Sequence, residues 1–409
     1  MVQAAGPALE SITQSLAATR AARVQELVQQ VAPVLRASAA ASEAARCLAP
    51  EAMAALIDAG IVRALLPAVY NGAELGPVYG SKLFEELATI DSAASWVGMI
   101  SAAGAWLTIL LPPQAADEIL ANPRAVVNGS LFPPLSAEPV QGGYRVTGRT
   151  AFGSGCTYAT WFGAQAVVME NGAPKLGANG IPATLLVHFP ATEAEIIDHW
   201  HTLGMRGTGS HDFQVSDIFV PEHRVWPIGP YAPVNPAFTD ALSRMGLWWF
   251  SPIVASVSLG TARAAVADLI ELAQAKTPSY MQVGLADKPV VQDKLARARA
   301  TVDAARSYLY SALGEAEEVV RTQPRLSLEQ GIPLALAASY AIEAAAQAVD
   351  LVHSCVGTSG IREEQRFQQY FRDVHTISQH AFVSSSRFES VGKLMLGRES
   401  DWPFYYLQR

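Results

Sequence analysis

The chain has 409 residues, of which 50% are hydrophobic and 16% charged, with a formal net charge of −8 and a pI near 5.5. This length predicts two or three domains or one large composite domain, and the apolar content predicts a large core with some surface buried between subunits. An acidic chain without a basic stripe argues against a nucleic-acid-binding protein.

Three widely separated cysteines, Cys47, Cys156 and Cys355, form no CxxC pair. An odd, unclustered set is typical of reduced thiols and predicts a cytoplasmic protein. The N-terminus lacks the basic-then-apolar order of a signal peptide, which agrees with this prediction.

Residues 8 to about 125 are predicted to be helical, because apolar residues recur three and four apart and Gly60 is a plausible helix stop. Within them, SAASWVGMISAAGAWLTILLPPQAA, which begins at Ser92, has no charge and imitates a membrane span. It is rich in alanine, glycine and serine, and two prolines at 112 and 113 interrupt it. A buried helix of the core is therefore the preferred interpretation, and no membrane partner is expected.

Residues 125 to about 225 contain short β-branched runs separated by glycines and prolines, such as GGYRVTGRTAFGSG, ATLLVHF and DFQVSDIFV. They predict the strands of an antiparallel sheet or barrel. From residue 243 to about 396 the helical pattern returns with alanine-rich segments, whose small side chains let helices pack closely, as in a four-helix bundle.

Because strands and helices are segregated along the chain, the α+β class is favoured over a doubly wound sheet. We predict an N-terminal helical domain over residues 1–125, a middle β domain over 126–235 and a C-terminal helical bundle domain over 236–409.

Two motifs carry weak functional signals. LGMRGTGSHD begins a GxGxxG pattern, but Asp212 stands where the last glycine belongs and no helical run follows, so a tight turn between strands is favoured over a dinucleotide site. In DHWHTL, His199 and His201 would share one face of a strand. No third ligand is evident nearby, and no metal site is predicted.

The segment AFGSGCTYATWFG places Ser154 between two glycines, which let a planar group approach the backbone closely. Spacing alone favours a strand bulge with an incidental serine. Later, VGTSGIREEQRFQQYFRDVHTISQH predicts a glycine-bearing loop and a helix, on which Asp373, His380 and Ser384 would share a face. A lone histidine there is more often a satisfied core residue than a catalyst.

The order of helices, sheet and helical bundle is similar to that of the acyl-CoA dehydrogenase fold. HTLGMRGTGSHDFQVSDIFVPEHRV resembles a middle-domain segment of that superfamily, and GGYRVTGRTAFGSGC resembles its strand pair that ends against the flavin. LGTARAAVADLIELA resembles the first bundle helix, and VGTSGIREEQRFQQYFRDV resembles the loop and Arg-Asp helix near the end. The resemblance covers nearly the whole chain, and these motifs are specific when taken together.

Two departures separate the chain from the dehydrogenases. NGSLFPPLSAEPVQGG stands where they carry a Thr-Glu-Pro-x-x-Gly-Ser segment, and in RDVHTISQHAF His380 takes the place of a catalytic glutamate. Removing an α-proton from a thioester requires a carboxylate base beside the flavin. Both departures resemble the flavin-dependent monooxygenases of the same fold, in particular the aromatic-hydroxylase branch with its indole and steroid-ring enzymes.

This resemblance implies the oxygenase component of a two-component enzyme. A separate NAD(P)H:flavin reductase would supply FADH2 or FMNH2, and O2 would form a C4a-hydroperoxyflavin that hydroxylates a phenol- or indole-type substrate in a dry pocket. In that group a serine and a histidine lie at the flavin, and they match Ser154 and His380. His380 is expected to act as a base or to bond to the peroxide, since a histidine pKa lies near neutrality.

Further site residues are expected with less specificity. Besides Ser154, the expected flavin contacts are Phe152, Gly155, Trp96, Gln292 and Arg263. The expected substrate contacts are His380 with Trp248, Trp249 and Phe250, although ordinary core packing explains any one of these aromatic rings equally well.

Gln292 matches a superfamily glutamine that reaches the adenylate end of the flavin in a neighbouring subunit. The arginine and phenylalanine of the same motif are missing, which leaves FAD and FMN open. The superfamily commonly forms tetramers, and a homotetramer is expected here.

Three alternatives stay open. One is an acyl-CoA dehydrogenase or oxidase with a relocated base, and another is a non-enzymatic flavin-binding protein that keeps the fold. The third is an S- or N-oxygenase, because these reactions use the same hydroperoxide as ring hydroxylation.

Overall fold

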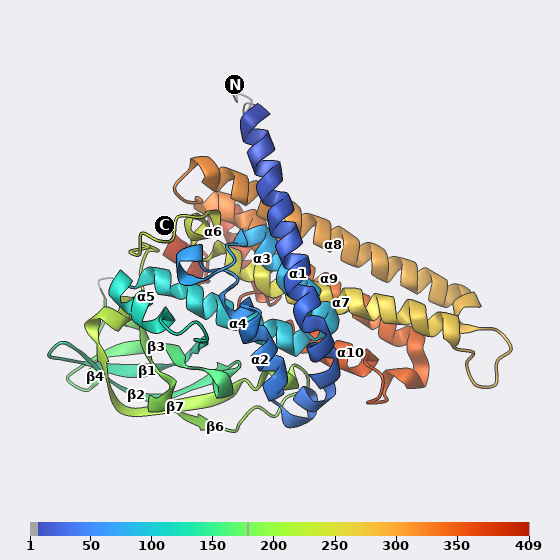
Figure 1. Ribbon diagram of the computed structural model, residues 1–409, viewed down its shortest axis with the longest axis horizontal. Coiled ribbons are helices and arrows are strands. Elements are labelled where there is room, and N and C mark those ends of the chain that lie inside the picture. Colours follow the sequence, from blue (N-terminus) through green and yellow to red (C-terminus); the bar gives the residue numbers. More distant parts are fainter. Residues whose placement is uncertain (1–6, 178–179, 409) are drawn as a thin grey trace.

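The computed structural model describes residues 7–177 and 180–408. Its N-terminal part is helical, and its first helix extends beyond the body of the molecule (Figure 1). Pro50, Pro77 and Pro113 each lie in the first turn of one of these helices, where the missing N–H has no helical partner to lose. The helices are α1 (Pro7–Ala45), α2 (Pro50–Asp58), α3 (Gly76–Ile90), α4 (Ser92–Trp106) and α5 (Pro113–Leu120).

Helix α4 lies at the centre of the fold, between the sheet and the remaining helices (Figure 1). Its N-terminus is capped by Asp91, whose carboxylate accepts the N–H groups of Ala93 and Ala94. Three stretches of the described chain are long and apolar enough to cross a membrane, namely Ser92–Leu110, Ala241–Ala275 and Leu328–Gly360. They are 83%, 78% and 61% buried within the fold, so packing in the protein core accounts for their apolar composition.

The middle part of the chain forms one sheet in the order β6-β7-β2-β1-β3-β5-β8, with β4 paired to β3. Its strands are β1 (Val127–Val140), β2 (Gly143–Gly153), β3 (Trp161–Glu170), β4 (Ala173–Pro174), β5 (Thr184–Pro190), β6 (Glu195–Ile197), β7 (His211–Pro221) and β8 (Val225–Pro227).

The prediction of a purely antiparallel sheet is wrong for one pair, because β1 and β3 run parallel, with Val127 opposite Trp161. After β2, the short turn η4 (Cys156–Tyr158) carries the chain past the start of β1, so that β3 begins beside it. The sheet is therefore mixed. Its strand path is open, with β6 and β8 at the two ends, and not closed into a barrel.

The C-terminal part is helical again, as predicted, and α7, α8 and α9 pack along one another (Figure 1). Small residues permit close approach, as predicted from the alanine-rich segments. A Cβ atom on Gly260 would lie 2.1 Å from the carbonyl oxygen of Glu85, so α7 and α3 meet backbone to backbone. The helices are α6 (Ala241–Met245), α7 (Phe250–Ala275), α8 (Pro289–Thr322), α9 (Leu328–Val356), α10 (Phe367–Ile377) and α11 (Ser386–Met395).

Two apolar cores result from this arrangement. The larger one lies among the helices, and the smaller one lies on the sheet, where the rings of Phe162 and Phe213 stack with centroids 4.1 Å apart. The candidate site lies where the sheet meets α4 and the C-terminal helices.

Candidate active site

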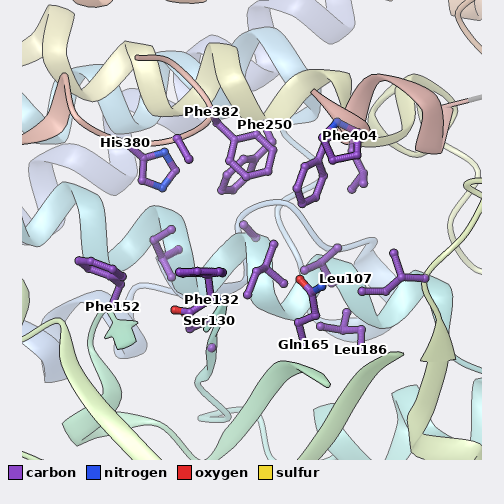
Figure 2. A pocket seen from close by; sticks show the side chains of 18 of the residues that line it. Leu107, Ser130, Phe132, Phe152, Gln165, Leu186, Phe250, His380, Phe382 and Phe404 are labelled. Atoms are coloured by element: carbon purple, nitrogen blue, oxygen red, sulfur yellow. The ribbon is translucent and has the colours of Figure 1, made fainter. Parts of the chain in front are cut away.

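A cavity of about 1620 Å³ lies between the sheet, α4 and the C-terminal segments. Pockets for one small molecule hold roughly 300–1,000 Å³, so this cavity has room for two ring systems. Most of its lining side chains are apolar or aromatic. Figure 2 shows His380, Phe250, Phe382 and Phe404 on one wall, facing Phe152, Ser130, Phe132, Gln165 and Leu186 on the other.

The end of β2 forms the part of the wall that carries Ser154. The pairing of β2 with β7 shifts register between Thr150 and Gly153, and Phe152 has a left-handed backbone with φ of 62°. This bulge leaves the ring of Phe152 62% exposed toward the cavity and turns the chain so that the Ser154 N–H donates to the Phe152 carbonyl, 2.9 Å away. A strained non-glycine residue beside a cavity is typical of a functional site.

Ser154 and His380 are brought together through Trp96 of α4. The indole Nε1–H of Trp96 donates to Ser154 Oγ at 3.0 Å. The same indole meets the imidazole of His380 edge to face, with ring centroids 5.3 Å apart. All three residues line the cavity, so this trio, predicted from separate parts of the sequence, occupies one corner of it.

His380 lies just beyond the last helical turn before it, and not on the helix. Helix α10 ends at Ile377, where the hydroxyl of Ser378 donates to the carbonyl of His375 and so competes with the helical ladder. The predicted shared helical face of Asp373, His380 and Ser384 is therefore wrong. The backbone N–H of His380 instead donates to the carbonyl of Ile377 in a turn, which aims the imidazole at the cavity.

The imidazole of His380 is enclosed by the rings of Trp96, Phe250 and Phe382. Burial in this apolar setting lowers the pKa of His380 to about 4, so the ring is neutral at physiological pH. Its Nδ1 is buried without a hydrogen-bond partner among the described residues. A neutral imidazole offers one N–H and one acceptor nitrogen, and an unpaired buried nitrogen is costly unless a ligand satisfies it.

Among the described residues that line the cavity, only Glu399 carries a carboxylate, and it is exposed. Asp373 is buried elsewhere, where its Oδ1 accepts the backbone N–H of Met205 at 2.6 Å and burial raises its pKa to about 7. No carboxylate is therefore placed beside His380 in the way that thioester deprotonation requires.

The aromatic residues predicted to bind substrate divide into two groups. Trp249 and Phe250 line the cavity, whereas Trp248 does not. The indole of Trp248 is buried and stacks on Tyr405 with centroids 5.2 Å apart. The structure thus corrects this prediction and assigns Trp248 to the core.

Three of the predicted flavin contacts also lie outside the cavity lining. A Cβ atom on Gly155 would lie 2.8 Å from Val97, so its missing side chain serves the packing of β2 on α4. Arg263 donates to Glu85 and Glu86 at 2.6 and 2.7 Å, which ties it to the helical core. Gln292 is exposed on α8, and the predicted contact of Gln292 with a neighbouring subunit stays a prediction.

The two histidines of DHWHTL do not lie on a strand, because β6 ends at Ile197 and the His201 N–H donates to the His199 carbonyl. His201 instead lies 3.7 Å from Asp198 Oδ1. Over residues 7–177 and 180–408, no group of three or more His, Cys, Asp and Glu residues could hold a metal ion.

Several lining residues were not anticipated. Phe382 follows His380 by two positions, and Gln165 occupies an inward position of β3, so their spacing could have indicated them. Trp200 lies between the two histidines of DHWHTL and was overlooked beside them. Phe404 comes from the C-terminal segment, for which the sequence pattern gave no signal.

The residues at the cavity fit a flavin ring system. The cavity is large enough for a tricyclic ring and a substrate. It is lined by the unpaired Nδ1 of His380, the hydroxyl of Ser154 and the rings of Phe152 and Trp96. Residues 253–385 match the family model described as acyl-CoA dehydrogenase, C-terminal domain. Fold, site and sequence agree with the resemblance predicted from the motifs, because the chain is similar to flavin-dependent monooxygenases with the acyl-CoA dehydrogenase fold.

The relatives in this class are similar over most of the chain. A pigment production hydroxylase of a Rhodococcus species is 28% identical over 91% of this chain and 96% of its own length. The oxygenase component of an FADH2-dependent resorcinol hydroxylase from a Rhizobium species is 29% identical, over 91% and 93%. The indole-3-acetate monooxygenase of Pseudomonas putida is 29% identical, over 83% and 85%.

Solved structures agree on the fold. XiaF from a Streptomyces species, in complex with FADH2 and glycerol, superimposes with a TM-score of 0.87 at 25% identity, over 96% of this chain and 99% of that one. The HsaA monooxygenase from Mycobacterium tuberculosis gives a TM-score of 0.84 at 23% identity, over 93% and 99%.

Proposed function

We propose that the chain is the oxygenase component of a two-component flavin-dependent monooxygenase that hydroxylates an aromatic substrate of the phenol or indole type. The observation that carries this proposal is the neutral, unpaired imidazole of His380, which faces a large apolar cavity next to Trp96 and Ser154. The named activities of the relatives, which include a resorcinol hydroxylase and an indole-3-acetate monooxygenase, support the choice of an aromatic substrate.

The residues that line the cavity would bind the flavin and exclude water. Ser154, Phe152 and Trp96 would hold the flavin ring, and reduced flavin supplies the electrons with which O2 is activated. The aromatic walls formed by Trp249, Phe250 and others exclude water, which would otherwise divert reduced oxygen into H2O2.

His380 would orient the substrate. With a pKa of about 4 it is an acceptor in the resting site, so it would receive a hydrogen bond from a phenol O–H or an indole N–H. Oxygen transfer to the substrate ring makes the phenol O–H or indole N–H more acidic, and His380 would then take its proton. We do not assign this role to Glu399, because its side chain is exposed to solvent.

The proposal extends to partners and assembly. A separate NAD(P)H:flavin reductase would deliver FADH2 or FMNH2 in the cytoplasm. The Rhizobium relative, which is an oxygenase component, supports a separate reductase. We also propose a homotetramer in which α7, α8, α9 and α10 form a bundle between subunits. Exposed apolar side chains on or near these helices, among them Met281, Tyr308 and Tyr340, support burial there.

The test combines the purified chain with photoreduced FAD or FMN, 18O2 and a panel of phenols, indoles, thioethers and amines. We expect one 18O atom in a ring-hydroxylated product. An oxygenated thioether or amine as the only product would assign S- or N-oxygenation instead. Bleaching of the oxidised flavin by an acyl-CoA thioester without O2 would identify a dehydrogenase, and flavin binding without any product would leave a binding protein.

A further inference from the structure

A row of buried hydroxyl groups runs from Ser154 along the wall of the cavity. Ser154 Oγ lies 2.7 Å from Ser210 Oγ, which lies 2.7 Å from Thr208 Oγ1, which donates to the carbonyl of Met205 at 2.8 Å. At the other end, Trp96 Nε1 donates to Ser154 Oγ at 3.0 Å. The three hydroxyl residues are at most 7% exposed, so no bulk water competes for these bonds.

The two ends of this row determine in which direction each hydroxyl group donates its proton. An indole N–H can only donate and a carbonyl oxygen can only accept, while each hydroxyl has one proton. If Thr208 donates to Met205, then Ser210 must donate to Thr208 and Ser154 must donate to Ser210. Ser154 then accepts from Trp96, and its remaining lone pair points to the cavity, where it can only accept.

The opposite direction is possible but contains one bond fewer. If Thr208 donates to Ser210 and Ser210 to Ser154, the bond from Thr208 to Met205 is lost and Ser154 turns its own proton to the cavity. The Met205 carbonyl stays satisfied in both cases, because it also accepts Trp200 Nε1–H at 3.0 Å. The first proton arrangement therefore contains one more hydrogen bond than the second. One hydrogen bond corresponds to a ratio of populations of roughly two- to tenfold in favour of the first arrangement.

The row is anchored firmly enough to keep this geometry. Thr208 belongs to the turn η6 (Arg206–Thr208), and its carbonyl accepts the Gly155 N–H at 2.9 Å, next to Ser154 itself. Met205 is held from the other side, because its N–H donates to Asp373 on α10. The hydroxyl row thus joins β2, the 205–210 turn and α10, which are the three elements that position Ser154 and His380.

We propose that Thr208 and Ser210 are positioning residues that fix Ser154 as a hydrogen-bond acceptor toward the cavity, and so favour reduced flavin over oxidised flavin. The N5 atom of a reduced flavin carries a proton and donates, whereas N5 of an oxidised flavin can only accept. If Ser154 can only accept, it forms a hydrogen bond with the N5–H of reduced flavin, whereas it leaves N5 of oxidised flavin without a donor. The inference rests on the proposed function, since it takes the N5 edge of the flavin to face Ser154.

The test is the substitution Thr208→Val, which removes one hydroxyl with little change in shape. In this variant Ser210 loses Thr208 as its acceptor and becomes free to donate to Ser154, which then turns the Ser154 proton to the cavity. Dissociation constants for photoreduced and oxidised flavin are measured by anaerobic fluorescence titration. We expect the ratio of the two constants to move toward oxidised flavin by roughly two- to tenfold or more, and Thr208→Ser, which restores the hydroxyl, to return it to the wild-type value.

A matched control exists in the same chain. Thr108 is also buried, and its hydroxyl also donates at 2.8 Å to the carbonyl three residues earlier, but it has no link to Ser154. Thr108→Val should leave the ratio unchanged. If wild-type chain prefers reduced flavin and Thr208→Val keeps that preference, or if Thr108→Val shifts the ratio equally, the inference is wrong while the proposed function stands. If wild-type chain binds neither form, both are wrong.

Discussion

His380 has a lowered pKa and an unpaired ring nitrogen at the wall of the cavity. Its ring is packed among aromatic side chains, which lowers its pKa to about 4, yet its Nδ1 has no partner among the described residues. His188 in the sheet also combines a lowered pKa with an unpaired Nδ1, but it does not line the cavity, whereas the ring of His380 does. The arrangement at His380 instead keeps a neutral acceptor available to a ligand.

Replacing His380 with Ala should therefore abolish hydroxylation without removing the flavin. Loss of a positioned acid–base group typically costs about 10²–10⁴-fold in rate. We expect product to fall within that range, H2O2 to rise in its place, and the dissociation constant of reduced flavin to change by less than about twofold, which is the scale of a single lost weak contact. Single-turnover product analysis with peroxide assay measures all three. Normal product yield would remove His380 from the mechanism.

The pH dependence of the reaction should reflect the lowered pKa of His380. Because the pKa of His380 is lowered to about 4, the imidazole stays neutral well below its ordinary value of 6.5. We expect single-turnover hydroxylation to lack an inflection near pH 6.5 and to decline only as pH approaches 4 to 5. An ordinary histidine base would lose activity a full two pH units earlier, and a rate profile with that midpoint would contradict the burial argument.

At the residue scale, the sequence could indicate the chemistry but not the direction of each side chain. His380 and Ser154 were predicted from family resemblance, and both line the cavity. Trp248 and Trp249 are adjacent, and nothing local separates them. One packs on Tyr405 and the other lines the cavity, because the turn that opens α7 rotates them to different sides.

At the scale of elements, the site depends on close contact between the 203–210 segment and α10. Gly204 has no space for a side chain, since a Cβ atom there would lie 2.2 Å from the backbone carbonyl oxygen of Arg372. Asp373 fixes the next residue, Met205, through its backbone N–H. These contacts set how the end of α10, and with it His380, is placed against β2.

Gly204→Ala should separate these two elements. The added methyl group meets backbone, which cannot rotate away, and overpacking of this kind costs about 1–3 kcal/mol. We expect the urea midpoint to fall and hydroxylation to fall with it. Gly314→Ala is the control, because this glycine is exposed on α8 with nothing within 4 Å, so alanine should stabilise the helix by about 0.5–1 kcal/mol. Equal effects of the two substitutions would argue against a tight interface.

His188 of β5 is a buried histidine of the sheet whose pKa is also lowered. It is 1% exposed, packs beside Gly163 of β3, and burial lowers its pKa to about 4. The unfolded chain, with an ordinary histidine pKa of 6.5, binds more protons between pH 6.5 and 4, so this histidine stabilises the fold above that window and the stability is lost as pH falls through it.

We therefore expect His188→Gln to flatten the pH dependence of unfolding. Between pH 7 and pH 5, His188 should account for about 2 kcal/mol of the loss in unfolding free energy. Urea titrations of wild type and variant at both pH values give this difference directly, independent of any constant effect of the substitution. An identical pH dependence in the two proteins would mean that His188 titrates normally.

Element types were largely predictable from periodicity, whereas their partners were not. Alternation of apolar residues identifies a strand but says nothing of which strand lies beside it, and the parallel pairing of β1 with β3 was missed for that reason. The end of α10 was missed because the pattern continues past Ile377, while the hydroxyl of Ser378 ends the helix locally.

At the scale of the whole molecule, one chain lines the described cavity, whereas the predicted flavin contact of Gln292 would require a neighbouring subunit. Gln292 is exposed near the start of α8, outside the cavity lining, and its side chain donates to the Ala286 carbonyl at 2.9 Å. Exposed apolar residues lie close to it, with Tyr280, Met281 and Val283 in the loop before α8. If a neighbouring subunit covers this region, Gln292 would face that subunit's flavin.

Gln292→Ala separates FAD from FMN in that arrangement. Only FAD has an adenylate end, so loss of one amide hydrogen bond should weaken binding of reduced FAD by roughly two- to tenfold and leave reduced FMN unchanged. Anaerobic titration of both flavins, with light scattering to follow the oligomeric state, gives the result. Gln347→Ala is the control, because Gln347 is an exposed glutamine on α9 whose side chain bonds to Glu343, one turn earlier. Equal affinities for FAD in wild type and Gln292→Ala would show that the adenylate lies elsewhere or that FMN is the natural cofactor.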